Sequence, residues 1–384
     1  MVNMLDFSTT PEWISFYVFA ISAFLLVIYY AIFFSRMAFS RVKKNNNHET
    51  TKQQPVSVVI CAKNEYQNLK NNIPKLLEQD YPAYEVILVN DFSQDDSYYL
   101  LKSYQEKYKN FRVINLRENV NFFEGKKLAL ALGIKSATYN TILLTDADCE
   151  PAGNAWIRSM SNCFQEKTEI VLGYGGYKKH PGFLNMLIRY DTFFIAMQYM
   201  GFAKAGLAYM GVGRNLAYKK DLFFRSGGFT SHYKINSGDD DLFINKVAKK
   251  NNTETCLHPD SFTFSEPEKN FSKWFKQKKR HLSTGSYYRL SHKLLLGTFA
   301  ATNILFYISF AAYLYFQQTS LTLYLSLGLF LLKTFFLMLL CFGAGKRLGE
   351  KKLFWVSPIF DLTFAFLNPV FAVSNLFYKK NKWK

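Results

Sequence analysis

The sequence predicts an α/β fold, with a mainly parallel sheet and helices on both of its faces, joined to helices that cross a membrane. Two observations support this class. From Pro55 onward, short apolar runs rich in β-branched residues alternate with segments of helical spacing, which is the pattern of a parallel sheet covered by helices. Long apolar runs nearly free of charge flank this part, and their length suits a helix that spans a bilayer.

The alternation can be followed element by element. Strands are expected at residues 56–61, 85–90, 111–115 and 141–145. Helices are expected at residues 68–79, 97–108 and 126–137. The first turn from strand to helix, residues 61–65, lacks Gly-x-Gly-x-x-Gly, so a dinucleotide site of the Rossmann type is not expected.

Composition narrows the class of partner. The chain has 384 residues and a net charge of +18, which would suit either nucleic acid or an anionic membrane surface. The sequence contains no recognised nucleic-acid module, and its apolar stretches favour the membrane, so no nucleic-acid partner is expected. Five cysteines are scattered without metal-ligand spacing, which indicates a reduced, cytosolic domain.

Three apolar segments are expected to span the membrane, at residues 13–34, 294–316 and 321–342. Acidic residues precede the first segment and a basic cluster follows it. The positive-inside rule therefore places the amino terminus outside and the next domain in the cytoplasm. The predicted organisation is a membrane helix with its basic flank (1–44), a cytoplasmic domain (45–290) and a carboxyl-terminal membrane region (291–384).

The last apolar segment, residues 353–378, is ambiguous. It contains two prolines and ends in a basic tail, so a broken or interfacial helix is favoured over a fourth span, which stays open as the alternative. Charged residues inside a membrane seldom stand alone, so Lys333 is expected to pair with Asp361.

Acidic residues follow several of the predicted strands. Asp146 and Asp148 end the strand at 141–145, Asp91 follows the second strand, and Glu65 follows the first. The carboxyl ends of parallel strands share one edge, where ligands bind in open α/β sheets. Carboxylates there suit Mg²⁺ or Mn²⁺ bound to a substrate phosphate, although a solvated turn or a helix cap would use the same residues.

Four segments, residues 58–65, 89–95, 124–130 and 146–148, resemble the ordered motifs of inverting family 2 glycosyltransferases with the GT-A fold, a Rossmann-like fold. The resemblance extends to about residue 290. It implies a nucleotide-diphosphate sugar as donor, with a UDP-sugar favoured, and Mg²⁺ or Mn²⁺ held by Asp148. The donor-binding residues that it implies are Ala62, Asn64, Glu65, Asp91, Lys126 and Asp146.

Further segments resemble the acceptor side of the same family. Residues 211–218 suggest Gly213 and Asn215 as acceptor contacts, because glycine lets the backbone approach a sugar closely. Inverting transfer needs a general base, and the acidic triplet 239–241 supplies carboxylates whose pKa would be raised by their like charges. The resemblance to a Gly-Asp-Asp variant selects Asp240, with Asp239 as the second choice. Acids at a helix start are also simply favourable.

Residues 277–281 resemble the Gln-x-x-Arg-Trp motif of membrane-embedded processive members of the family. Gln277 and Arg280 match the motif and would lie on the donor side, with the arginine near the leaving diphosphate. His281 stands where the motif has tryptophan, which puts processive polymer synthesis in doubt. The mixture of aromatic and basic residues around the motif also suits a helix at a membrane surface.

The resulting hypothesis is a multi-pass, membrane-bound inverting glycosyltransferase of the hexosyl or N-acetylhexosaminyl type, in contact with membrane lipids. It would act on a lipid-linked or glycan acceptor at the cytoplasmic face of a bacterial inner membrane and make cell-envelope polysaccharide. Alternatives are a processive polysaccharide synthase, a nucleotidyltransferase and a non-catalytic membrane scaffold. A nucleotidyltransferase should carry a glycine-rich basic loop near the first strand, and Lys63 alone does not make one.

Overall fold

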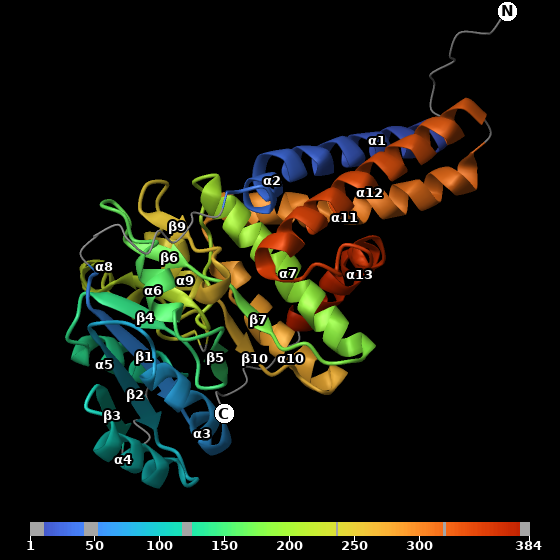
Figure 1. The fold of residues 1–384 in the computed structure, drawn as a ribbon. Coiled ribbons are helices and arrows are strands. Elements are labelled where there is room, and N and C mark those ends of the chain that lie inside the picture. Colours follow the sequence, from blue (N-terminus) through green and yellow to red (C-terminus); the bar gives the residue numbers. More distant parts are fainter. Residues whose placement is uncertain (1–10, 42–52, 117–124, 236, 318–319, 377–384) are drawn as a thin grey trace, which may run out of the picture.

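The structure is a computed structural model and describes residues 11–41, 53–116, 125–235, 237–317 and 320–376. Figure 1 shows a sheet region from which long helices extend to one side. The helices are α1 (Pro11–Tyr29), α2 (Ser35–Ala38), α3 (Tyr66–Leu77), α4 (Ser97–Lys107), α5 (Lys127–Ser136), α6 (Trp156–Ser161), α7 (Phe183–Lys204), α8 (Lys220–Arg225), α9 (Asp241–Val247), α10 (Phe271–Leu282), α11 (Leu290–Phe316), α12 (Ser320–Leu348) and α13 (Ser357–Leu376). The strands are β1 (Val56–Ala62), β2 (Tyr84–Asp91), β3 (Phe111–Leu116), β4 (Thr141–Leu144), β5 (Cys149–Pro151), β6 (Ile170–Leu172), β7 (Gly175–Tyr177), β8 (Leu216–Lys219), β9 (Thr253–Thr255) and β10 (Thr263–Ser265).

The main sheet has the strand order β3-β2-β1-β4-β8-β6-β9. Its first four strands are parallel, as the alternation of strand and helix predicts. β8 runs antiparallel to both β4 and β6, so the far half of the sheet is mixed. A second, small sheet has the order β5-β10-β7. The fold class expected from the sequence is confirmed, as mostly parallel strands with helices plus four candidate membrane-spanning helices.

Both faces of the sheet are covered, and the alternation of side chains along β1 shows how. Val58 and Ile60 pack with Leu69 and other residues of α3 on one face. Val59 packs with Ile134 of α5 on the opposite face. Every residue of β1 is buried, which is typical of a central parallel strand covered by helices on both sides.

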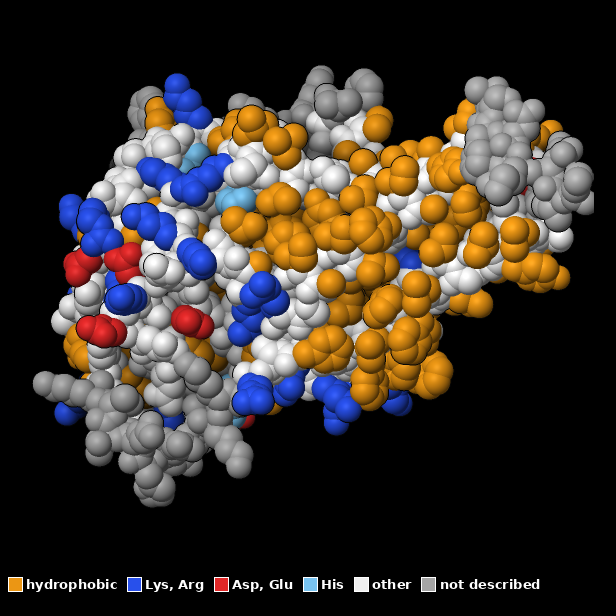
Figure 2. Space-filling model, turned by 90° about the horizontal axis from the view of Figure 1, so that it is seen from above, with side chains coloured by type: hydrophobic (Ala, Val, Ile, Leu, Met, Phe, Trp, Pro, Cys, Tyr) orange, Lys and Arg blue, Asp and Glu red, His pale blue; other side chains and the backbone are white. Residues whose placement is uncertain are grey.

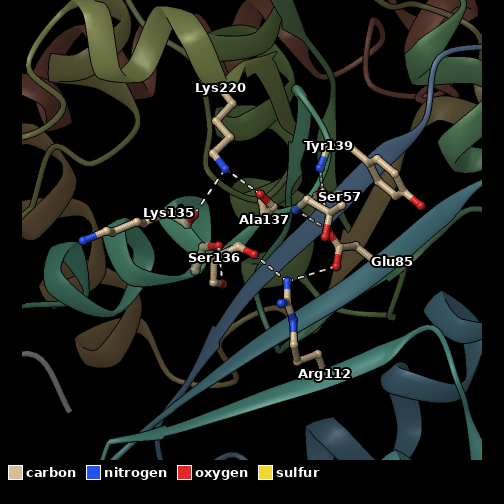
Figure 3. A network of polar contacts seen from close by, with 10 residues as sticks. Ser57, Glu85, Arg112, Lys135, Ser136, Ala137, Tyr139 and Lys220 are labelled. Atoms are coloured by element: carbon tan, nitrogen blue, oxygen red, sulfur yellow. Dashed lines mark hydrogen bonds and ion pairs between the residues drawn. The ribbon is translucent and has the colours of Figure 1, made fainter.

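A network of polar contacts at the amino ends of the strands anchors the end of α5 (Figure 3). Arg112 donates to the Glu85 carboxylate at 3.0 Å and to the Ser136 carbonyl at 2.5 Å. Lys220 donates to the Ala137 carbonyl at 2.5 Å. Cations suit the carbonyl end of a helix. With its last turn fixed here, α5 points its first turn at the opposite, carboxyl edge of the sheet.

Four helical segments among the described residues are long and apolar enough to cross a membrane: Pro11–Ala38, Leu290–Phe316, Ser320–Leu348 and Ser357–Asn375. Figure 2 shows a broad hydrophobic face, with lysine and arginine gathered over the rest of the molecule. Exposed apolar residues of all four segments contribute to such a surface, among them Phe24, Ile308, Phe335 and Ile359. The three predicted spans fall within the first three segments.

The fourth segment differs in part from its expectation. α13 is one continuous helix that includes Pro369, so the expected break is wrong. Figure 1 shows α1, α11 and α12 side by side, whereas α13 lies at the base of this bundle, next to α7 and α10. An interfacial position for α13 stays a prediction, as does the sidedness of the sheet region. The basic tail and Glu124 lie outside the described residues.

The expected intramembrane pair is present. Lys333 of α12 donates to the carboxylate of Asp361 on α13, and both side chains are buried. Tyr307 donates to the same carboxylate at 2.7 Å, and Asn303 donates to its other oxygen at 3.3 Å. The Lys333 ammonium also lies 4.8 Å from the centre of the Phe306 ring. This cluster therefore joins α11, α12 and α13.

Breaking this pair should destabilise the helix bundle. Asp361→Ala leaves the Lys333 ammonium buried without its anion, which for a buried pair costs about 3–5 kcal/mol. The double variant Lys333→Met, Asp361→Leu removes both charges and should recover most of that loss, as thermal unfolding in detergent would measure. A double variant as unstable as Asp361→Ala would contradict this account.

Candidate active site

The acidic residues predicted at the strand ends lie on the carboxyl edge of the parallel part of the sheet. β1 pairs with β2 and with β4 in parallel, so the ends of these three strands share one edge. Asp91 is the last residue of β2, Glu65 follows β1, and Asp146 and Asp148 follow β4. Burial raises the pKa of Asp91, and Lys63 partly offsets that effect.

Lys126 connects this edge to the acidic triplet. It immediately precedes α5, and its ammonium lies 2.7 Å from the Asp146 carboxylate and 3.1 Å from the Asp239 carboxylate. Burial disfavours the charged ammonium, but the two carboxylates outweigh this and raise the pKa of Lys126 well above its ordinary value. Burial also acts on Asp146, yet Lys126 holds the pKa of that carboxyl below its ordinary value. One cation therefore joins β4 to the start of α9.

Lys127, the first residue of α5, holds the loop that leads into the acidic triplet. The Lys127 ammonium is buried and donates to the Ser237 carbonyl at 2.7 Å and to the Ile235 carbonyl. Burial lowers the pKa of Lys127. The first turn of α5 thus holds both a carboxylate of the triplet and the loop that leads into it.

The three aspartates of the triplet have different surroundings. Asp239 is buried and paired with Lys126. Asp241 is buried and accepts hydrogen bonds from the hydroxyls of Thr284 and Tyr288, the latter at 2.8 Å. Asp240 keeps partial solvent exposure. Asp240 is therefore the aspartate of the triplet that solvent, and hence an acceptor hydroxyl, can reach most readily.

Asp240 is held by backbone groups and has a strongly shifted pKa. Its carboxylate accepts the Gly213 amide at 2.6 Å and the Asp241 amide at 2.8 Å. Burial, together with the charges of Asp239 and Asp241, raises the pKa of Asp240 to about 7. A carboxylate with a pKa near neutrality is suited to general-base catalysis.

Gly213 eases this close approach. A Cβ atom at that position would lie 3.3 Å from the Asp240 carboxylate and 3.5 Å from the Lys126 ammonium. The absence of a side chain therefore lets the backbone amide reach Asp240. The sequence predicted a close approach of backbone to a sugar at Gly213, and here the glycine brings the backbone to the candidate base.

Asp146 and Asp148 could hold a divalent metal. Their carboxylate oxygens and the Cys149 sulfur all lie within 4.8 Å of one another. Although Asp148 keeps contact with solvent, desolvation of its carboxylate by the surrounding protein and the neighbouring Asp146 charge raise its pKa, which is the effect that a bound cation would relieve. Asp148 is exposed, whereas the Cys149 thiol is buried against the Ser265 hydroxyl at 3.1 Å. The two carboxylates fit Mg²⁺ or Mn²⁺, and the thiol does not.

The loop after β1 is tied to the loop after β2. The Asn64 amide donates to the Ser93 hydroxyl at 2.9 Å, and its side-chain oxygen accepts the Gln94 amide at 2.7 Å. Asn64 has a φ of 54°, a left-handed conformation that asparagine tolerates. The Glu65 carboxylate accepts from Asn68 at 2.6 Å. These contacts shape the donor edge, so Asn64 and Glu65 stay predicted donor residues.

Two predicted site residues have side chains in the core. Ala62 is completely buried, so only its backbone could face a donor. Asn215 is also completely buried, donates to the Tyr174 and Ser261 carbonyls at 2.9 and 2.6 Å, and accepts from Trp156 at 3.2 Å. The Asn215 side-chain amide is thus engaged in the packing of β8 against neighbouring loops, and its contact with the acceptor stays a prediction.

α10 carries the Gln-x-x-Arg pair and joins the site to the membrane helices. The Gln277 side chain accepts from the Tyr177 hydroxyl at 3.4 Å, and Arg280 contributes to lowering the pKa of Asp146. On another face, Trp274 packs against aromatic rings of α13. Lys278, expected at a basic surface, is instead buried in an ion pair with Asp191 of α7 at 2.7 Å.

Several functional contacts escaped the sequence reasoning. Lys127 and Arg214 each stand next to a predicted site residue, Lys126 and Gly213, within the same motif. Their position beside a predicted residue is the signal that could have identified them. Thr284 and Tyr288 bind Asp241 from more than forty positions away in the sequence, and no local pattern marks such pairs.

Comparison with known proteins identifies a family 2 domain within this chain. Residues 57–225 match the model of glycosyl transferase family 2. A poly-beta-1,6-N-acetyl-D-glucosamine synthase from Staphylococcus epidermidis is 29% identical over 93 residues, which cover 24% of this chain and 21% of that protein. A glycosyltransferase from Synechocystis is 35% identical over 98 residues, 25% of this chain and 30% of that protein. The chain thus spans well under half of these curated relatives.

A solved structure gives the fold. The mannosyltransferase from Pyrobaculum calidifontis, determined in complex with GDP-Man and Mn²⁺, matches with a TM-score of 0.58 at 18% identity. The match covers 92% of this chain and 99% of that one. Residues 57–225 therefore form a glycosyl transferase family 2 domain, and the chain has the GT-A fold. The family match ends at residue 225, so the roles of the acidic triplet and of α10 depend on the geometry above.

The role of Asn215 can be tested by its removal. Asn215→Ala would leave the Trp156 ring N–H and the Ser261 carbonyl without this partner, whereas the Tyr174 carbonyl keeps the Thr263 amide. Each buried orphan group costs about 1–3 kcal/mol. A clear drop in unfolding temperature in detergent is expected. Unchanged stability with a raised KM for the acceptor would instead support a direct contact between Asn215 and the acceptor.

Proposed function

We propose that this chain is a membrane-bound inverting glycosyltransferase that moves a sugar from a nucleotide-diphosphate sugar to a hydroxyl of a lipid-linked or glycan acceptor. The observation that carries the proposal is the Lys126 bridge. It brings the strand-end carboxylates of a donor site next to Asp240, a partly exposed carboxylate with a pKa of about 7. A non-catalytic scaffold has no need of such a carboxylate.

The donor would bind along the carboxyl edge of the sheet. Asp91, at the end of β2, would hold a base or ribose, and Arg280 of α10 would meet the diphosphate. Asp148, with Asp146 beside it, would hold Mg²⁺ or Mn²⁺, which would neutralise the diphosphate as a leaving group. The neighbour with the same fold was solved with GDP-Man and Mn²⁺, which supports a nucleotide sugar and a metal. A UDP-sugar remains the favoured donor.

The chemical step follows from the placement of Asp240. As the acceptor oxygen bonds to the anomeric carbon, Asp240 takes the hydroxyl proton, and the bond from that carbon to the diphosphate oxygen breaks. The nucleoside diphosphate leaves, and the anomeric centre inverts because attack and departure occur on opposite faces. Asp239, held by Lys126, keeps the pKa of Asp240 high.

The acceptor is proposed to be attached to the membrane. Asp241 binds Tyr288, which stands two residues before α11, so the triplet is tied to the start of a candidate membrane helix. Arg280 lies on α10, whose Trp274 packs on α13. A hydroxyl on a lipid-linked sugar would reach Asp240 at this junction.

A processive synthase is the second candidate. Several matched relatives are named as poly-beta-1,6-N-acetyl-D-glucosamine synthases, which favours it. His281 in place of the motif tryptophan opposes it. The length of the product made from one acceptor separates a single transfer from polymer synthesis.

Asp148→Asn should abolish turnover, because it removes the anionic metal ligand beside the diphosphate. The assay is release of nucleoside diphosphate from a panel of UDP-, GDP- and dTDP-sugars by purified protein in detergent, with Mg²⁺ or Mn²⁺. Wild-type activity that survives EDTA, or full activity of the variant, would contradict the metal assignment. Glu169→Gln is the matched control, because it removes the charge of a carboxylate that pairs with Arg225 away from the site.

Asp240→Asn should lower transfer at least ~10²-fold while leaving donor affinity nearly intact, because general-base catalysis is typically worth that much. In wild type, kcat/KM should fall as pH drops through about 7, since the base acts only when Asp240 is deprotonated.

Asp239→Asn is the companion variant. It removes a negative charge beside Asp240 and frees Lys126, and both changes lower the pKa of Asp240. The pH at which kcat/KM falls on the acid side should therefore move to a lower value. Loss of transfer in Asp239→Asn with full activity in Asp240→Asn would show that the base is Asp239. Loss of donor affinity in both would place the triplet in the nucleotide site.

A further inference from the structure

Arg214 is a half-buried arginine that the site described above does not use. It follows Gly213 in the loop that leads into β8. Its guanidinium lies 4.5 Å from the centre of the Tyr177 ring, a cation–π arrangement that fixes the plane of the side chain. Its backbone carbonyl accepts the hydroxyls of Thr145 at 3.0 Å and Thr263 at 2.9 Å. Backbone and side chain are therefore both held in place.

The guanidinium has donors to spare. Its contacts within the protein are long ones, to the Gly176 carbonyl at 3.5 Å and to the Ser265 hydroxyl at 3.4 Å. Within the described part of the chain, Arg214 forms no ion pair, whereas Arg189 and Arg225 each pair with a glutamate. A guanidinium offers five N–H groups in a planar fork, so most of this capacity is open to an anionic ligand.

The position of Arg214 identifies the anion. Ser265, which its guanidinium contacts, lies 3.1 Å from the Cys149 sulfur, and that sulfur lies 3.5 Å from the Asp148 carboxylate. Thr145, which binds the Arg214 carbonyl, immediately precedes Asp146. Two side chains, Ser265 and Cys149, thus link the Arg214 guanidinium to a carboxylate that fits a metal. The Lys126 ammonium is less available to bind an anionic ligand, because it is already paired with Asp146 and Asp239.

We propose that Arg214 binds the diphosphate of the donor and makes the site select nucleoside diphosphates over monophosphates. The inference rests on the proposed function, because it takes the metal-side carboxylates to be the donor site. A planar guanidinium matches phosphate oxygens in a bidentate manner, which lysine cannot reproduce. The Tyr177 hydroxyl donates to Gln277 at 3.4 Å, so this ring stands between Arg214 and α10.

The test is the binding of UDP and UMP, and of GDP and GMP, to the full chain in detergent with Mn²⁺, by calorimetry. Arg214→Gln should weaken binding of the diphosphate roughly 10- to 100-fold, the range expected for hydrogen bonds to a charged group, and leave the monophosphate unchanged. Arg214→Lys should fall between wild type and Arg214→Gln. Arg225→Gln, which removes an exposed arginine outside the site, should bind like wild type.

Tyrosine variants test the stacking. Tyr177→Phe keeps the ring and should keep the preference for diphosphate, whereas Tyr177→Leu should weaken it. Unfolding temperatures of all variants show whether they fold.

Other outcomes overturn the assignment. Equal binding of UDP and GDP by Arg214→Gln and wild type, or equal losses for mono- and diphosphates, would exclude a diphosphate contact. Unchanged nucleotide binding with a raised KM for a lipid-linked acceptor would move the contact to the acceptor. Wild type that binds no nucleoside diphosphate would overturn the proposed function and, with it, the role of Arg214.

Discussion

The ammonium of Lys126 is the interaction on which the rest of the site depends. It lies between Asp146, at the end of β4, and Asp239, at the start of α9. Without it, carboxylates from two distant parts of the chain would repel one another in a partly buried space, which is costly. α5 can place this lysine because its far end is anchored by Arg112 and Lys220 (Figure 3).

The site also lies where the sheet region meets the candidate membrane helices. Asp241 binds Tyr288 just before α11, and the buried Lys278–Asp191 pair joins α10 to α7. Within the bundle, Lys333 and Asp361 hold α12 to α13. Buried charges of this kind fix one arrangement more than they add stability, because each must meet its partner. The candidate membrane helices and the carboxylates of the site are thus joined by direct contacts.

Much of this could be predicted from the sequence, for physical reasons. The strands from Val56 to Leu144 follow local patterns of burial, and the edge where Asp91 and Asp146 meet follows from parallel pairing. The contacts of Asp241 with Thr284, and the use of Asn215 in packing, depend on tertiary contacts that no local pattern encodes. Mixed aromatic and basic residues suggested a surface helix around Lys278, but this lysine is paired with Asp191 on another helix. The continuous helix through Pro369 is likewise a tertiary outcome.

The central claim is that the Lys126-bridged carboxylates form one donor and acceptor site. A structure of the chain with Mn²⁺ and a nucleoside diphosphate, with the metal located by its anomalous scattering, tests this most directly. The account predicts the metal at Asp148, the diphosphate between that metal and Arg214, and Asp240 left free to face an acceptor. Metal bound by the 239–241 triplet, or a nucleotide away from the carboxyl edge of the sheet, would contradict it.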